Sequence, residues 1–141
     1  MKRFASINDT ANEFIAELYV RLDRTVSAFG ETCLNCKACC DFGRAGHRLF
    51  VTNLELAYFV AKVPEVKRPR GSVCPYLDPS TGCTVRQIRP VGCRAFFCKP
   101  PEGYDPHSIT EQALREIKSF VDREKTPYQY CEWLGALDQL V

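Results

Sequence analysis

Four parts of the chain place hydrophobic residues at the three- or four-residue spacing of an amphipathic helix. The longest covers residues 10–29, where Thr10 with Glu13 matches a capping box and Gly30 can end the helix. We therefore predict an N-terminal helix that packs one face against a core. That face consists of Ala11, Phe14, Ile15, Leu18, Tyr19, Leu22, Val26 and Phe29.

A second helical pattern covers residues 53–62. Thr52 and Glu55 repeat the capping-box pattern at its start, and Pro64 limits its C-terminal end. The basic, proline-rich residues that follow, "VPEVKRPRGS", predict a loop.

The C-terminal part predicts helices that together span about residues 109–140. The first runs from about residue 110 to residue 124, with Ser108 and Glu111 as its expected cap. The second is short and runs over about residues 128–140. Their apolar residues are Ala113, Leu114, Ile117, Phe120, Val121, Trp133, Leu134, Leu137 and Leu140.

Residues 72–101 show a different pattern, because cysteine, proline and glycine interrupt them throughout. Such a stretch predicts short turns and one helical turn around Val85–Ile88. No part of the chain shows sustained period-two alternation, so no strand is predicted. The fold class that follows is mainly α: a small helical fold with irregular cysteine-rich loops that a bound metal would staple together.

We predict a single domain over residues 1–141. Its metal-binding core would span about residues 33–98, flanked by the N-terminal helix and the C-terminal helices. The length of 141 residues, 45% hydrophobic content and 26% charged content suit one globular domain.

Charge and hydropathy narrow the possible partners and location. The formal net charge is +2, from 19 basic and 17 acidic residues, so nothing calls for a nucleic-acid partner. No run of 18 apolar residues predicts a membrane span, and the N-terminal residues show no secretory signal. We therefore expect a cytoplasmic protein, and in that compartment structural disulfides are rare.

Eight of the nine cysteines fall into two blocks. Clustered thiols in a reducing compartment are typical of metal sites, and cysteine thiolates bind both zinc and iron–sulfur clusters. The predicted ligands are Cys33, Cys36, Cys39, Cys40, Cys74, Cys83, Cys93 and Cys98.

The first block, "CLNCKACC", contains two successive Cys-x-x-Cys steps. They match the first three ligands of a bacterial ferredoxin, but Gly43 stands at the fourth position, so a plain ferredoxin is not favoured. The adjacent pair Cys39 and Cys40 would strain to share one ion, which favours a polynuclear centre or two centres. How the eight thiols divide among sites stays open.

Residues next to the cysteines suit thiolate ligands. Gly82 and Gly92, each directly before a cysteine, allow backbone conformations that other residues resist. Arg86, Arg89 and Arg94 either donate hydrogen bonds to sulfur or lie on the surface, and the sequence leaves both possibilities open. Outside the blocks, Cys131 is expected to be a small buried hydrophobic residue.

Together the two blocks resemble the YkgJ-like cysteine-cluster family, whose CxxCxxCC domain is associated with zinc or iron chelation. Its second motif stands here as "CPYLDPSTGCTVRQIRPVGCRAFFC", with Val85-Arg86 in place of the usual Ile-Tyr. The resemblance covers about residues 33–98 and implies a bound metal, often an iron–sulfur cluster. It implies no defined reaction.

The sequence predicts a metal- or cluster-binding module, with iron–sulfur favoured over zinc. One alternative is an iron–sulfur electron-transfer component, and another is a structural zinc module for protein contacts. No catalytic residue, organic-cofactor motif or particular protein partner can be assigned, so whether the protein is an enzyme stays open.

Overall fold

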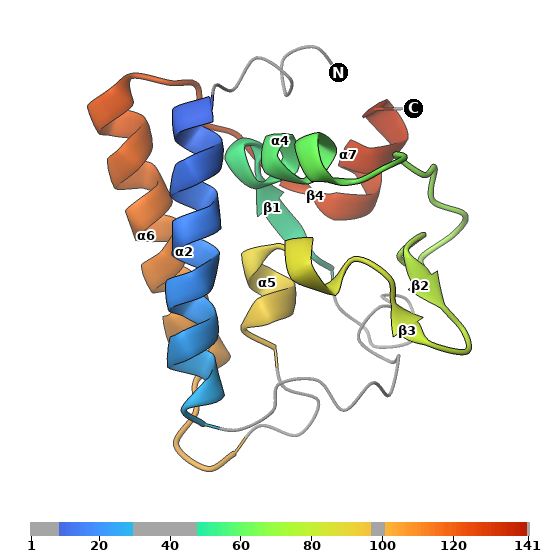
Figure 1. The fold of residues 1–141 in the computed structure, drawn as a ribbon, viewed down its shortest axis with the longest axis horizontal. Coiled ribbons are helices and arrows are strands. Elements are labelled where there is room, and N and C mark those ends of the chain that lie inside the picture. Colours follow the sequence, from blue (N-terminus) through green and yellow to red (C-terminus); the bar gives the residue numbers. More distant parts are fainter. Residues whose placement is uncertain (1–8, 30–47, 97–100, 141) are drawn as a thin grey trace.

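The computed structural model describes residues 9–29, 48–96 and 101–140. Helices account for most of these residues, which confirms the mainly helical prediction (Figure 1). The helices are α2 (Asp9–Ser27), α4 (Asn53–Lys62), the 3-10 turn η2 (Arg86–Ile88), α5 (Val91–Arg94), α6 (Pro106–Glu124) and α7 (Trp133–Leu140). The strands are β1 (Phe50–Thr52), β2 (Leu77–Asp78), β3 (Gly82–Cys83) and β4 (Tyr130–Glu132).

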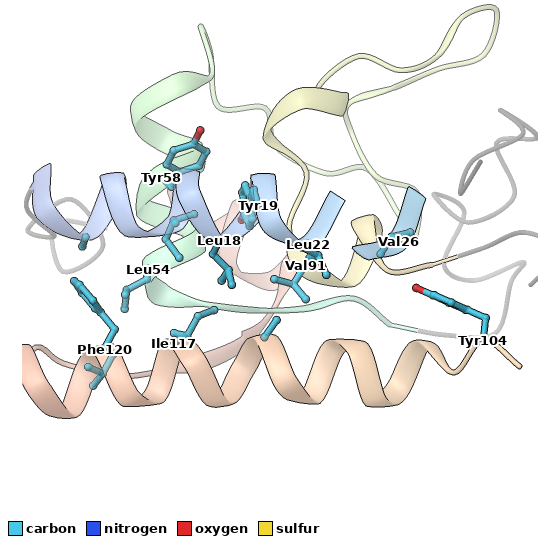
Figure 2. Close-up of a cluster of buried hydrophobic side chains, with 14 residues drawn as sticks. Leu18, Tyr19, Leu22, Val26, Leu54, Tyr58, Val91, Tyr104, Ile117 and Phe120 are labelled. Atoms are coloured by element: carbon cyan, nitrogen blue, oxygen red, sulfur yellow. The ribbon is translucent and has the colours of Figure 1, made fainter. Parts of the chain in front are cut away.

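The two long helices, α2 and α6, lie side by side (Figure 1). The rings of Phe14 and Phe120 stack with centroids 4.4 Å apart, and an ion pair of 2.8 Å joins Arg21 to Glu116. The predicted apolar faces meet here, and Figure 2 shows Leu18 directed toward Ile117. In the described part of the chain, no helix is both long enough and apolar enough to cross a membrane.

We call the packed residues between α2, α4, α5 and α6 the first core cluster (Figure 2). It contains Ala11, Ile15, Leu18, Tyr19, Leu22, Val26, Leu54, Tyr58, Val91, Tyr104, Ala113, Ile117, Phe120 and Val121. Phe29, predicted to belong to this face, is 43% exposed and meets the edge of the Tyr104 ring instead.

Helix α4 has the bounds that the sequence predicts. Thr52 Oγ1 accepts the backbone N–H of Glu55, and the Glu55 carboxylate accepts the backbone N–H of Thr52. This reciprocal capping box satisfies two donors that the first helical turn leaves unpaired. The prediction succeeds because its signal lies within four consecutive residues.

The second core cluster lies around Trp133, between α4, α7, β1 and the residues that precede β2. The ring of Phe59 meets the edges of Tyr76 and Trp133, at centroid distances of 5.1 Å and 4.9 Å. The cluster contains Leu49, Val51, Leu56, Phe59, Cys74, Tyr76, Trp133, Ala136, Leu137 and Leu140.

Short strands are the feature that the sequence did not predict. β1 pairs antiparallel with β4, with Val51 opposite Cys131, and residues 130–132 are therefore extended where a helix over 128–140 was predicted. The side chain of Asn53 fixes this approach, because Oδ1 accepts from Gln129 N–H at 2.8 Å and Nδ2 donates to the Pro127 carbonyl at 3.0 Å. These hydrogen bonds join segments that are far apart in the sequence. They therefore produce no local hydrophobic periodicity from which a strand could be predicted.

Helix α6 begins at Pro106, earlier than the predicted start near residue 110. Asp105 is the N-cap: its carboxylate accepts the His107 N–H at 3.0 Å and the Ser108 hydroxyl at 2.8 Å. Proline at the first helical position favours this start, since its fixed φ suits the first turn. Ser108 therefore lies inside the helix, and the predicted Ser108–Glu111 cap is wrong.

Candidate metal centre

Three of the eight predicted cysteine ligands, Cys74, Cys83 and Cys93, belong to the described residues. The other five, Cys33, Cys36, Cys39, Cys40 and Cys98, lie outside them. In residues 9–29, 48–96 and 101–140, no group of three or more His, Cys, Asp or Glu side chains could hold a metal ion. The three described cysteines therefore do not make a metal site by themselves.

A tight hairpin joins Cys74 to Cys83. The carbonyl of Cys74 accepts the N–H of Leu77 at 3.1 Å, and Leu77 then pairs with Cys83 across the β2–β3 ladder. Thr84 extends the connection, because its N–H and its hydroxyl both donate to the Tyr76 carbonyl, at 2.9 Å and 2.6 Å. The backbone thus holds the first two cysteines of the second block in one small unit.

Gly82 has the role that the sequence predicts. Its φ is +91°, a left-handed conformation in which a side chain is strained, and it directly precedes Cys83 at the hairpin. Asp78 completes the turn, since its carboxylate accepts the N–H groups of Ser80 and Thr81.

Gly92 is required for a different reason from the one predicted. It lies inside α5, where no unusual φ is needed, but the Cβ of an alanine there would lie 2.6 Å from Leu49 Cδ1. The missing side chain lets Leu49, a buried member of the second core cluster, pack directly against the turn that carries Cys93. Gly92 therefore provides space.

Gly92→Ala is expected to lower the free energy of unfolding by about 1–2 kcal/mol, because Leu49 must leave its packed position. Denaturant unfolding measures this. Gly135→Ala in α7 is the matched control: its new Cβ would meet only the end of the Glu132 side chain, at 3.2 Å. Glu132 Oε1 also accepts the Gly135 N–H at 2.9 Å, so a small shift of this carboxylate should offset the gain in helix propensity, and we expect a change within about 0.5 kcal/mol. Equal losses in both variants would contradict the close-packing explanation.

Cys74 and Cys93 share one apolar environment. Cys74 is buried within the second core cluster, and Cys93 is half-buried and packs against the same cluster. The cluster also contains Trp133, whose buried Nε1 has no hydrogen-bond partner among the described residues. A buried N–H without an acceptor is costly, and an anionic sulfur is an acceptor that such a group can serve.

The predicted arginines separate into two kinds. Arg86 is exposed, and Arg89 is half-buried with its Nε 3.0 Å from the Arg86 carbonyl. Arg94 is only 3% exposed, so the surface alternative is wrong for this residue. The hydrogen bonds found for it go to oxygen atoms: the Arg89 and Gln87 carbonyls and the Asp23 carboxylate.

A second buried charge, Glu55, was predicted only as a helix cap. Its Oε1 also accepts the N–H of Val91 at 2.7 Å and the hydroxyl of Tyr19 at 3.3 Å. Burial raises the pKa of the Glu55 carboxyl above its ordinary value, although these hydrogen bonds act in the opposite direction. Burial also raises the pKa of Tyr19 well above its ordinary value, which keeps the hydroxyl a neutral donor.

Cys131 lies in strand β4 and not on a helix face. It is half-buried, packs against the second core cluster, and its Sγ lies 3.7 Å from the Val51 carbonyl. This apolar packing agrees with the expected role of a small hydrophobic residue, although Cys131 packs against the same cluster as Cys74 and Cys93.

Comparison with known proteins gives no match: no family model, no curated protein and no solved structure matches this chain.

Proposed function

We propose that this protein binds a metal ion or an iron–sulfur cluster through cysteine thiolates and acts as a metal- or cluster-binding module. The observation that carries the proposal is the placement of Cys74 and Cys93 on one apolar cluster, with Cys83 tied to Cys74 by the hairpin. Thiolates are ligands that zinc and iron–sulfur clusters both accept.

The surroundings of these cysteines support the same function. The buried Trp133 Nε1 would gain an acceptor if a thiolate or sulfide lay near it. Arg94 supplies a buried positive charge one residue from Cys93, which would offset part of the negative charge of a thiolate site. When bound, the metal would be coordinated by thiolates and would link the two cysteine-rich loops to each other.

The remaining ligands in this proposal are the cysteines of "CLNCKACC" together with Cys98, as the resemblance to the YkgJ-like family implies. The segment with the first four begins after Phe29 and ends before Arg48. Phe29 contacts Tyr104, whose hydroxyl donates to the Ala95 carbonyl, and Leu49 packs on Gly92. One flank therefore contacts α5 directly, and the other contacts the C-cap of α5 through Tyr104.

Elemental analysis and absorption of anaerobically purified protein test the proposal. We expect at least about one metal per chain and favour a brown protein whose visible bands bleach on reduction. Colourless protein with about two zinc ions would replace iron–sulfur by the structural zinc alternative. A reversible one-electron couple would favour the electron-transfer alternative. Metal-free protein with all nine thiols open to titration in the native state would contradict metal binding altogether.

A further inference from the structure

Helix α5, which carries Cys93, is too short to be stable by itself. It has four residues, a single turn, and the cost of nucleating one turn exceeds what its few hydrogen bonds return. Its N-cap, Pro90, makes no side-chain hydrogen bond to the turn. Contacts from elsewhere in the chain must therefore hold Cys93 in place.

The N-terminal end of α5 is held by α4. The Glu55 carboxylate accepts the Val91 N–H at 2.7 Å, and Val91 is itself buried in the first core cluster (Figure 2). A negative charge at this end also suits the partial positive charge of the first turn. Glu55 thus replaces the missing N-cap side chain.

The C-terminal end is held by Arg94. Its Nε donates to the Arg89 carbonyl at 2.6 Å, its Nη1 to Asp23 Oδ2 at 2.7 Å, and its Nη2 to the Gln87 carbonyl. The guanidinium also lies 4.0 Å from the centroid of the Tyr19 ring. One side chain therefore joins α5 both to α2 and to the η2 turn that precedes it.

We propose that Arg94 is a positioning residue for Cys93. It fixes the α5 turn against α2 and η2, and so fixes the Cys93 thiol at the second core cluster, where Cys74 also lies. This inference rests on the proposed metal-binding function. A lysine could keep the charge, but its single ammonium could not replace the planar guanidinium, which donates to three acceptors and stacks on Tyr19.

The test compares variants for binding of Co²⁺, used as a spectroscopic probe, to the reduced full-length chain. Arg94→Lys is expected to weaken Co²⁺ binding about 10- to 100-fold, as loss of a residue that orients a ligand does. In the Co²⁺-loaded variant, Cys93 is expected to react with iodoacetamide faster than in the wild type, while Cys74 and Cys83 stay protected. Mass spectrometry of the digested chain reads each cysteine separately.

Asp23→Ala is the second variant, because the Asp23 side chain is 54% exposed and we expect the variant to fold. It removes one acceptor of Arg94, so we expect a weaker effect in the same direction, selective for Cys93. Glu116→Ala is the matched control, since it breaks an exposed ion pair of α2, the 2.8 Å pair with Arg21, that does not involve Arg94. Co²⁺ affinity and Cys93 protection should not change in this control.

The outcomes separate the two proposals. Wild-type affinity and protection in both Arg94→Lys and Asp23→Ala would overturn the positioning role and leave metal binding intact. If Cys74, Cys83 and Cys93 lost protection equally, Arg94 would contribute to the stability of the whole fold. That outcome would also overturn the positioning role. If Arg94→Lys does not fold, Asp23→Ala decides alone. A wild-type chain that binds no Co²⁺ would overturn metal binding and this inference with it.

Discussion

Cys74→Ser is expected to destabilise the second core cluster by several kcal/mol, whereas Cys131→Ser should cost about 1 kcal/mol or less. Metal binding contributes on the order of 10 kcal/mol where the unfolded chain has no preformed site, and loss of one ligand removes part of that contribution. Both cysteines pack in or against the same cluster, so under the proposed function the two substitutions differ mainly in the loss of a metal ligand. A strong chelator added to the wild type should destabilise the protein even more than Cys74→Ser does.

Trp133 provides the measurement, because it is the only tryptophan of the chain and is buried in the second core cluster. Its fluorescence follows unfolding in denaturant with and without chelator, and far-ultraviolet circular dichroism follows the helices. We expect the chelator to shift the wild-type midpoint strongly and the Cys74→Ser midpoint little. Equal destabilisation by the two serine substitutions, or a wild type indifferent to the chelator, would count against the cysteine assignment.

Glu55→Ala is expected to lower the free energy of unfolding by about 3 kcal/mol at neutral pH. The substitution leaves four donors without their acceptor: the N–H groups of Thr52 and Val91 and the hydroxyls of Tyr19 and Thr52. Each buried donor left unpaired costs about 1–3 kcal/mol, and the lost cost of burying the carboxylate offsets part of that sum. Glu17→Ala, at an exposed position of α2, is the control and should stay within about 0.5 kcal/mol of the wild type.

The stability difference between the wild type and Glu55→Ala is expected to depend on pH. The pKa of Glu55 is raised in the folded state, so between its unfolded value of about 4.3 and the raised value the folded chain binds more protons. Stability from this group is therefore fully present below that window and is lost as pH rises through it. The gap in stability between wild type and Glu55→Ala should narrow as pH rises from about 4. If the stability difference between the two proteins widened over this range, the hydrogen bonds and not burial would determine the pKa of Glu55.

What the sequence could predict depended on how local each signal was. The bounds of α4 follow from Thr52 and Glu55, three residues apart, and the stripes of α2 and α6 repeat within each helix. The start of α6 was misplaced because two overlapping cap signals competed, and Asp105 with Pro106 prevailed over Ser108. Three-residue strands such as β1 and β4 carry no period, so only their pairing reveals them.

The candidate site shows the same limit. The cysteines were evident from spacing, and Gly82 could be explained from its place before Cys83. The space required at Gly92 depends on Leu49, and the buried state of Arg94 depends on Asp23 and on distant carbonyls. Such contacts join segments far apart along the chain, and a single sequence contains no pattern that records them.

The pairing of β1 with β4 also sets the order of events while the chain is being synthesised. Val51 and Cys131 are 80 residues apart, which at 5–20 residues per second corresponds to a wait of roughly 4–16 s. Trp133 then donates its backbone N–H to the Leu49 carbonyl and completes the second core cluster. Every cysteine of the two blocks leaves the ribosome's catalytic centre before that closure. If the chain binds metal as proposed, its thiols can therefore meet a metal donor during translation, before the second core cluster closes.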